Sequence, residues 1–358
     1  MLKFCMRIFS LFALSASVLF FIFNSAFAGN PTKVGFVYLT TPGDHGWTYA
    51  HDLGRQELDK IGVETTYVES VPETDAERVL RNLARRGYDI IFTTSFGYMD
   101  PTEKIAKQFP DTVFMHCSGF KTADNMGNYF ARMYQARYLA GMVAGLTTKT
   151  DRIGMIGSHP IPEIIRHINA FTLGAKQVNP RAQVQVLWVN SWFDPAKENA
   201  AANTLMDNGA DIVSITTDSA AATQAAEKRG LYAIGNDSDM TLYGPKAHLT
   251  ANIFNWGIYY KHVYNLVKEG KWEASSDWWG IETNAVDLSP YGEMVPQRTR
   301  QMVDSVKDRL IEGKFRVFTG PIHNQNGELV IDQGEMPSDQ ELLSMNYFVE
   351  GVLGDIPQ

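Results

Sequence analysis

Hydrophobic and polar positions alternate along the first part of the chain in a way that predicts strands followed by helices. Residues 33–39 form an apolar run rich in β-branched and aromatic side chains, which is typical of a buried strand. The run breaks at Pro42-Gly43, a turn signal, and apolar positions at near-helical spacing follow over 49–58. Further strands are predicted at 62–68, 88–94 and 113–116. This alternation predicts a parallel sheet with right-handed crossovers.

The pattern restarts after an apolar, small-residue helix predicted within 129–146 and a polar stretch at 147–151. Strands are predicted again at 152–157, 183–189, 211–216 and 231–235. A mature chain of about 330 residues is too long for one core, so the two series predict two doubly wound α/β lobes. The predicted N-terminal domain comprises residues 29–149 and about 253–280, and the C-terminal domain comprises 150–252 and about 281–358.

Polar and aromatic side chains follow the predicted strand ends, where ligands bind in open α/β sheets. The candidate ligand-binding residues at these positions are Asp44, Trp47, Thr48, Ser95, Phe96, Asn190, Trp192, Asp194, Asp218 and Asp237. Trp47 lies where the first loop becomes a helix, and a large ring at such a rim suits a flat ligand. Alternatively, Trp47 packs as a hydrophobic staple of its own helix.

The first 28 residues predict a cleaved signal peptide. Two cations precede an apolar core at 9–23, and Ala26-Phe27-Ala28 provides an A-x-A site, so the mature chain is expected to begin near Gly29. The core is short for a membrane span. Cys5 lies in the removed part, so a lipoprotein is not expected, and Cys117 alone remains, which excludes an intrachain disulfide. Export without disulfides fits a bacterial periplasm.

The charge of the chain argues against two classes of partner. Its 32 Lys and Arg residues face 40 Asp and Glu residues, a formal net charge of −8. The predicted signal peptide takes away two cations and no acid, so the mature chain becomes more negative still. Nucleic acids and anionic membranes attract basic patches, so neither is an expected partner.

Five short motifs occur in order along the chain: Gly154-Met155-Ile156-Gly157, Asp194-Pro195-Ala196-Lys197, Gly209-Ala210-Asp211, Ile234-Gly235-Asn236-Asp237-Ser238-Asp239 and Phe318-Thr319-Gly320-Pro321. Together they resemble the basic membrane protein family of ABC-importer substrate-binding proteins, whose well-understood branch binds purine nucleosides. The resemblance runs from about Lys33 to past Gly327. It implies a type I periplasmic-binding-protein fold, in which a hinge of three crossover segments joins two doubly wound parallel-sheet lobes around a purine.

The resemblance also implies how the base is held, namely between two aromatic rings, one from each lobe. The first family ring follows strand one in a pattern like Asp-x-Ser-Phe-Asn, which here places Trp47 at the ring position; the second precedes an Asp-Pro pair, which here indicates Trp192. Stacking on such a ring is worth roughly 1–3 kcal/mol per base. The family's sugar-binding acid matches Asp237, whose carboxylate can accept hydrogen bonds from ribose hydroxyls or base N–H groups.

The ribose side of the site departs from the family pattern. Relatives carry a lysine after a Leu-Thr-Ser strand, whereas the run that begins at Leu249-Thr250-Ala251 here reaches Phe254 at the lysine position. Gly46 and Thr48 also replace the family's usual polar pair. This less polar side favours a free purine base, adenine first, over a nucleoside.

Several of the charged residues have structural alternatives. Asp100 and Asp194 each precede a proline, a pairing typical of helix starts, which favours an N-cap for both. For Asp218 a pocket role and a cap role stay equally open, whereas the family resemblance favours the pocket for Asp237. Arg132 is expected to be an interlobe or cap-satisfying cation.

Enzymatic interpretations find little support in the sequence. The histidines show no metal-ligand spacing, Gly157-Ser158-His159 lacks the G-x-S-x-G elbow, and no P-loop or dinucleotide fingerprint is present. No cofactor and no metal are therefore expected. The sequence predicts a monomeric periplasmic solute-binding protein, not an enzyme, that delivers a purine to the permease of an ABC importer. A nucleoside-binding protein of the same fold, a ligand-sensing receptor module and a purine-processing enzyme are the alternatives.

Overall fold

The computed structural model describes residues 32–357. The predicted signal peptide, its cleavage site and the expected start at Gly29 lie outside these residues. Residues 32–357 belong to one compact unit. Within this described part, no helix is both long and apolar enough to span a bilayer.

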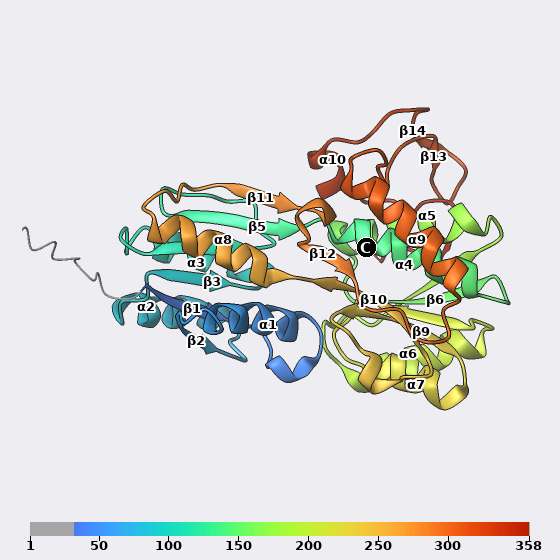
Figure 1. Cartoon of the computed structure of the whole chain (residues 1–358), viewed down its shortest axis with the longest axis horizontal. Coiled ribbons are helices and arrows are strands. Elements are labelled where there is room, and N and C mark those ends of the chain that lie inside the picture. Colours follow the sequence, from blue (N-terminus) through green and yellow to red (C-terminus); the bar gives the residue numbers. More distant parts are fainter. Residues whose placement is uncertain (1–31, 358) are drawn as a thin grey trace, which may run out of the picture. The chain divides into compact units, whose positions relative to one another are not determined.

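The first sheet has six parallel strands in the order β11-β5-β4-β3-β1-β2 (Figure 1). In chain order the strands are β1 (Lys33–Val37), β2 (Glu64–Val68), β3 (Ile90–Thr93), β4 (Val113–Cys117), β5 (Met126–Ala131) and β11 (Ser276–Trp279). Four helices pack with this sheet and are called the first lobe together with it: α1 (Trp47–Asp59), α2 (Ala76–Arg85), α3 (Met99–Ala106) and α8 (Trp256–Lys268).

The second sheet has seven strands in the order β12-β10-β9-β8-β6-β7-β15, and only the β10–β12 pair is antiparallel. The strands are β6 (Arg152–Gly157), β7 (Gln183–Trp188), β8 (Ile212–Ile215), β9 (Tyr232–Asp237), β10 (His248–Phe254), β12 (Val286–Leu288) and β15 (Val352–Leu353). The second lobe adds α4 (Met133–Thr147), α5 (Pro162–Val178), α6 (Pro195–Asp207), α7 (Ala221–Arg229) and α9 (Gln297–Ile311). The predicted α/β fold of two doubly wound parallel sheets is confirmed, with β12 as an antiparallel strand at one edge of the second sheet.

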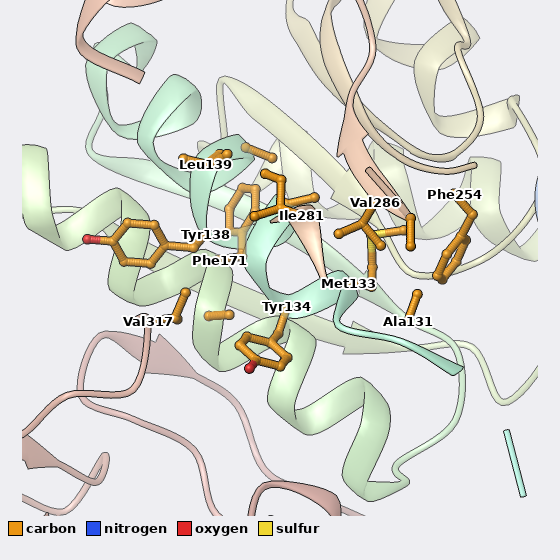
Figure 2. Packing of buried hydrophobic residues seen from close by; sticks show 14 of the residues in the cluster. Ala131, Met133, Tyr134, Tyr138, Leu139, Phe171, Phe254, Ile281, Val286 and Val317 are labelled. Atoms are coloured by element: carbon orange, nitrogen blue, oxygen red, sulfur yellow. The ribbon is translucent and has the colours of Figure 1, made fainter. Parts of the chain in front are cut away.

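Helix α4 lies in sequence before the predicted domain boundary at residue 149 but packs on α5 and β10 of the second lobe. The two helices approach closely through glycines: a Cβ added at Gly141 would lie 2.0 Å from the Phe171 carbonyl oxygen, and one at Gly174 would lie 1.9 Å from the Tyr138 carbonyl oxygen. Figure 2 shows Tyr138 and Leu139 of α4 beside Phe171 of α5. The domain boundaries stay a prediction. The packing of α4 on the second lobe concerns the boundary predicted at residue 149.

The chain passes between the two sheets three times, at 131–133, 254–256 and 279–286. Figure 2 shows apolar side chains from all three crossovers in the same buried cluster, among them Ala131, Phe254 and Ile281. The backbone N–H of Arg132 donates to the Trp279 carbonyl oxygen (2.7 Å), and its Nε donates to the Trp278 carbonyl oxygen (3.0 Å). The first and third crossovers are therefore held together by Arg132.

The last part of the chain, residues 316–357, folds over the second lobe. It contains β13 (Ile322–His323), β14 (Leu329–Ile331) and α10 (Asp339–Leu343), and β15 extends the second sheet beside β7. Buried Arg166 of α5 donates to the Leu342 carbonyl oxygen (2.6 Å), and Trp188 of β7 donates to the Asp355 carbonyl oxygen (2.8 Å). Short 3-10 helices complete the structure: η1 (Pro42–Asp44), η2 (Glu73–Asp75), η3 (Phe96–Tyr98), η4 (Thr241–Tyr243) and η5 (Ile281–Thr283).

Candidate ligand-binding site

The candidate site lies where the strand order of each sheet reverses. In the first sheet β1 lies between β2 and β3, and in the second sheet β6 lies between β7 and β8. Loops from two such neighbouring strands lead to helices on opposite faces of the sheet, which leaves a crevice at the carboxyl ends of the strands. The loops after β1 and β3 carry Trp47, Ser95 and Phe96, and the loops after β7 and β8 carry Trp192 and Asp218.

Trp47 is held by contacts to both lobes. It is the first residue of α1 and is half-buried. Its indole Nε1 donates to the Thr94 carbonyl oxygen at 2.6 Å, in the loop after β3, so the ring is tied across the crevice of the first sheet. Its backbone N–H donates to Oδ1 of Asp218 in the second lobe, at 3.3 Å.

Asp218 connects the two predicted aromatic residues. Its carboxylate accepts from the Trp47 backbone, and its own backbone N–H donates to the Trp192 carbonyl oxygen at 3.0 Å. Trp192 is half-buried, and its ring centroid lies 4.8 Å from that of His159. The structure therefore brings the backbones of Trp47 and Trp192 to a single residue, whereas a base held between the two rings stays a prediction.

Further contacts join the loop before α1 to the second lobe. The Ser238 hydroxyl donates to the His45 carbonyl oxygen, and His45 Nδ1 lies 2.7 Å from the Tyr243 hydroxyl. Gly46 approaches most closely, because a Cβ added there would lie 2.5 Å from the Asp218 Cα. These contacts hold the loop before α1 against the second lobe.

Asp44 and Thr48 form hydrogen bonds that stabilise the start of α1. Asp44 is buried, and its two carboxylate oxygens accept from the backbone N–H groups of Gly46, Thr48 and Tyr49, each at 3.0 Å. It also accepts from the Thr40 hydroxyl at 2.6 Å, and that hydroxyl in turn bonds to the Thr48 hydroxyl. Asp44 therefore satisfies the N-terminus of α1. Ligand contacts by these two residues stay a prediction.

The two aspartates that precede prolines behave differently. Asp194 is the N-cap of α6 and accepts from the Lys197 backbone N–H at 3.0 Å, as the cap alternative predicts. The expected cap role of Asp100 is wrong, because Tyr98 is the N-cap of α3 and Asp100 lies within the first turn. There its carboxylate pairs with the Lys121 ammonium at 2.8 Å.

The other three predicted site residues are Ser95, Phe96 and Asn190, and they differ in how far they are buried. Ser95 is buried, and its hydroxyl donates to Glu73 Oε1 at 3.3 Å. Phe96 is 57% exposed in η3, and Asn190 is exposed with a left-handed φ of 50°. All three follow strand ends, as the sequence predicts, and their part in binding stays a prediction.

Asp237 is the last residue of β9, and it is buried with a left-handed φ of 63°. Within residues 32–357 no group donates a hydrogen bond to its carboxylate. Burial raises the pKa of Asp237 to about 8, against the opposing effect of the Arg137 guanidinium. Burial likewise raises the pKa of Asp218, and the carboxylates of Asp44 and Asp237 add to that rise. A ligand contact by Asp237 stays a prediction.

The segment after β6 carries two polar side chains that the sequence analysis did not single out as candidates, one in the loop and one at the start of α5. Glu163, in the first turn of α5, is half-buried, and burial raises its pKa to about 7 although Arg166 and Arg137 oppose the rise. His159 lies against Trp192, and burial lowers the pKa of its imidazole. The available signal was their place in the segment that follows a central strand, since the other candidate residues also follow strand ends.

Replacing Asp237 by asparagine is expected to make the ligand-free protein more stable near neutral pH. The folded-state pKa lies above the ordinary value of 3.8, so the folded protein binds the proton more tightly and loses stability as the pH rises from about 4 to about 8. The variant should gain about 1 kcal/mol or more near pH 8 and show a flatter profile. Denaturant unfolding at several pH values measures this, with Asp308→Asn on exposed α9 as the control. Parallel profiles for Asp237→Asn and wild type would contradict the assignment.

Comparison with known proteins identifies the family. Residues 31–315 match the model of the Bmp family, described as ABC transporter substrate-binding protein PnrA-like. A purine-binding protein of Brucella abortus is 47% identical over 343 residues, which cover 95% of this chain and 98% of that protein. A Haloferax volcanii protein described as an ABC transporter glucose-binding protein is 39% identical over 332 residues, which cover 92% of this chain and 82% of that protein.

A solved structure supports the fold. A solute-binding protein of an ABC transporter system from Conexibacter woesei superposes with a TM-score of 0.69 at 23% identity, covering 80% of this chain and 98% of its own. With a family match over most of its length, the chain belongs to the Bmp family of PnrA-like ABC transporter substrate-binding proteins.

Proposed function

We propose that this protein binds a free purine base, adenine first, between Trp47 and Trp192 and delivers it to the permease of an ABC importer. The observation that carries the proposal is the position of Asp218, which bonds to the backbones of both tryptophans across the lobes. The identity to the Brucella purine-binding protein supports the ligand class. Two indoles would supply a large share of the binding energy, since each stacked base is worth roughly 1–3 kcal/mol.

The polar edge of the base would be bound by the second lobe. Asp237 offers a buried carboxyl group that accepts no hydrogen bond from residues 32–357. Glu163 offers a second carboxyl group at the start of α5. Ring N–H and amino groups of a purine are suitable donors for both. In this proposal the two acids fix the orientation of the base and the indoles supply most of the affinity.

Phe254 supports a base rather than a nucleoside. Its ring is buried and lies edge-on to Trp47, with a centroid distance of 5.4 Å and an interplanar angle of 86°. A lysine at this position could donate hydrogen bonds to ribose hydroxyls, whereas a buried phenyl ring cannot. The site therefore offers less to a sugar than the family's nucleoside-binding pattern does.

The proposal includes export to the periplasm by the predicted signal peptide, with cleavage near Ala28 and without lipid attachment. It also includes a monomeric protein that uses no cofactor and catalyses no reaction. The family supports the transport role, because its members are substrate-binding proteins of ABC transporters. A receptor module that reports the same ligand to a signalling partner would need the same cleft.

The test is to identify the bound molecule and then measure its affinity. Mass spectrometry of small molecules released by denaturing the purified protein should detect a purine. In calorimetry with ligand-free protein, adenine should bind at least as tightly as adenosine. Tighter binding of adenosine would favour the nucleoside alternative, and conversion of adenosine to inosine or to a free base would favour an enzyme.

Glucose is a second candidate ligand because of the Haloferax relative. A sugar ring can also lie against an indole, and the carboxyl group of Asp237 can accept from sugar hydroxyls. Calorimetry with glucose separates the two candidates: glucose binding without adenine binding would replace the purine proposal.

A further inference from the structure

Three nearly parallel aromatic rings form a stack beside Trp47. His51 of α1 lies on Trp256 with a centroid distance of 4.8 Å and an interplanar angle of 6°. Trp256 lies in turn on Phe254 at 4.6 Å and 15°. All three side chains are buried, and burial keeps the His51 pKa well below its usual range, so its imidazole is a neutral aromatic ring. We call these three residues the ring stack.

Every ring of the stack meets Trp47 edge-on. The centroid distances from Trp47 are 4.5 Å to His51, 5.4 Å to Phe254 and 5.9 Å to Trp256, with interplanar angles of 80°, 86° and 80°. Edge-to-face contacts are favourable and depend on ring orientation. Together with the hydrogen bond from Nε1 to the Thr94 carbonyl oxygen, they fix the plane of the Trp47 indole.

Two of the three rings of the stack come from the crossover between β10 and α8, and the third, His51, comes from α1. Phe254 ends β10 in the second sheet, and Trp256 begins α8 in the first lobe, so only Asn255 separates them. Figure 2 shows Phe254 beside Ala131 of the first crossover. Gly54 of α1 lets α8 approach, because a Cβ added there would lie 2.8 Å from the Trp256 Cβ. Two of the three rings that contact Trp47, Phe254 and Trp256, therefore belong to a backbone segment that joins the two lobes.

We propose that Phe254 and Trp256 are positioning residues that couple the conformation of the 254–256 crossover to the orientation of Trp47. The inference rests on the proposed role of Trp47 as a stacking surface for the base. If the backbone torsions of the crossover change when the lobes separate, Phe254 and Trp256 move relative to α1 and Trp47 loses its edge contacts. The stacking surface is then complete only in the arrangement of the crossover seen here, and purine binding favours that arrangement.

The test compares Trp256→Leu with the conservative Trp256→Phe. Losing these edge contacts should weaken adenine and adenosine binding by the same factor, roughly tenfold, because both ligands use the same ring. Trp256→Phe keeps an aromatic ring in the stack and should restore most of the affinity. The control is Phe114→Leu, a fully buried position in the separate core cluster of the first lobe, which should lower the melting temperature without changing affinity.

A ligand-independent readout keeps this inference distinct from the proposed function. The near-ultraviolet circular dichroism that disappears in Trp47→Phe includes the contribution of Trp47, and Phe254→Leu, which removes no indole, should change that band whereas Phe114→Leu should not. If wild-type protein binds no purine, the proposed function fails and this band still tests the positioning. An unchanged band in a folded Phe254→Leu variant overturns the inference, as does an affinity loss in Trp256→Leu that is matched by Phe114→Leu. If Trp256→Leu does not fold, Phe254→Leu takes its place with the same expected results.

Discussion

Replacing Trp47 by alanine is expected to raise the dissociation constant for adenine roughly 5- to 150-fold, because a stacked base contributes about 1–3 kcal/mol per ring. The truncation removes the stacking surface and also the bond from Nε1 to the Thr94 carbonyl oxygen. Trp192→Ala should cause a loss of similar size from the other lobe. Isothermal calorimetry on ligand-free protein measures both changes.

Controls for this experiment come from the same chain. Trp47→Phe keeps a ring and should retain most of the affinity. Trp272→Ala removes a half-buried indole from the segment between α8 and β11, away from the site loops, and should leave binding unchanged. Wild-type affinity in both Trp47→Ala and Trp192→Ala would remove the physical basis of the proposed ligand class.

Adding a methyl group at Gly46 is the second change for which a large loss of affinity is expected. A Cβ there would lie 2.5 Å from the Asp218 Cα and 2.7 Å from its carbonyl oxygen, and backbone atoms cannot move aside as a flexible side chain can. Gly46→Ala should therefore hold the lobes apart at the contact that carries the Trp47–Asp218 bond. Overpacking typically costs about 1–3 kcal/mol, which corresponds to roughly 5- to 150-fold in affinity.

The matched control is Gly43→Ala in the same loop, where a Cβ would approach only the Thr41 hydroxyl, at 3.2 Å. It should bind adenine as wild type does. Small-angle scattering with saturating adenine should show a larger radius of gyration for Gly46→Ala than for Gly43→Ala. Equal affinities and equal radii for the two variants would show that the lobes close without the Gly46 contact.

The strands were predictable because buried parallel strands are continuous apolar runs bounded by turn residues. The run predicted at 152–157 is β6, and those predicted at 33–39 and 183–189 contain β1 and β7. The lobe to which α4 belongs was not predictable from its pattern. Most of this helix is buried, so no single apolar face indicates the sheet on which it packs.

The short strands near the end of the chain carry no periodic signal. Strands β13 and β15 have two residues each, and such short segments cannot show an alternation of apolar and polar positions. Their pairing depends on tertiary contacts with β14 and β7. The organisation of residues 316–357 could therefore not be predicted from the sequence.

The candidate site was predictable in position but not in the role of each side chain. Strand ends indicate where ligands bind, and the structure places Trp47 and Asp218 in contact there. An aspartate that satisfies a helix N-terminus has the same sequence surroundings as one that binds a ligand, so the structural role of Asp44 was not predicted. The difference between Asp44 and Asp237 is tertiary: four groups donate to Asp44, whereas none within residues 32–357 donates to the buried Asp237.

The family match ends at residue 315, yet the second sheet is completed by β15 at Val352–Leu353. A truncated protein that ends at residue 315 would lack β15 and expose the outer edge of β7. Unpaired strand edges can pair with strands of other chains. The same cut would take the carbonyl acceptors of Leu342 and Asp355 away from Arg166 and Trp188. Recombinant versions designed from the family limit alone would therefore be prone to self-association through an edge that the intact molecule covers.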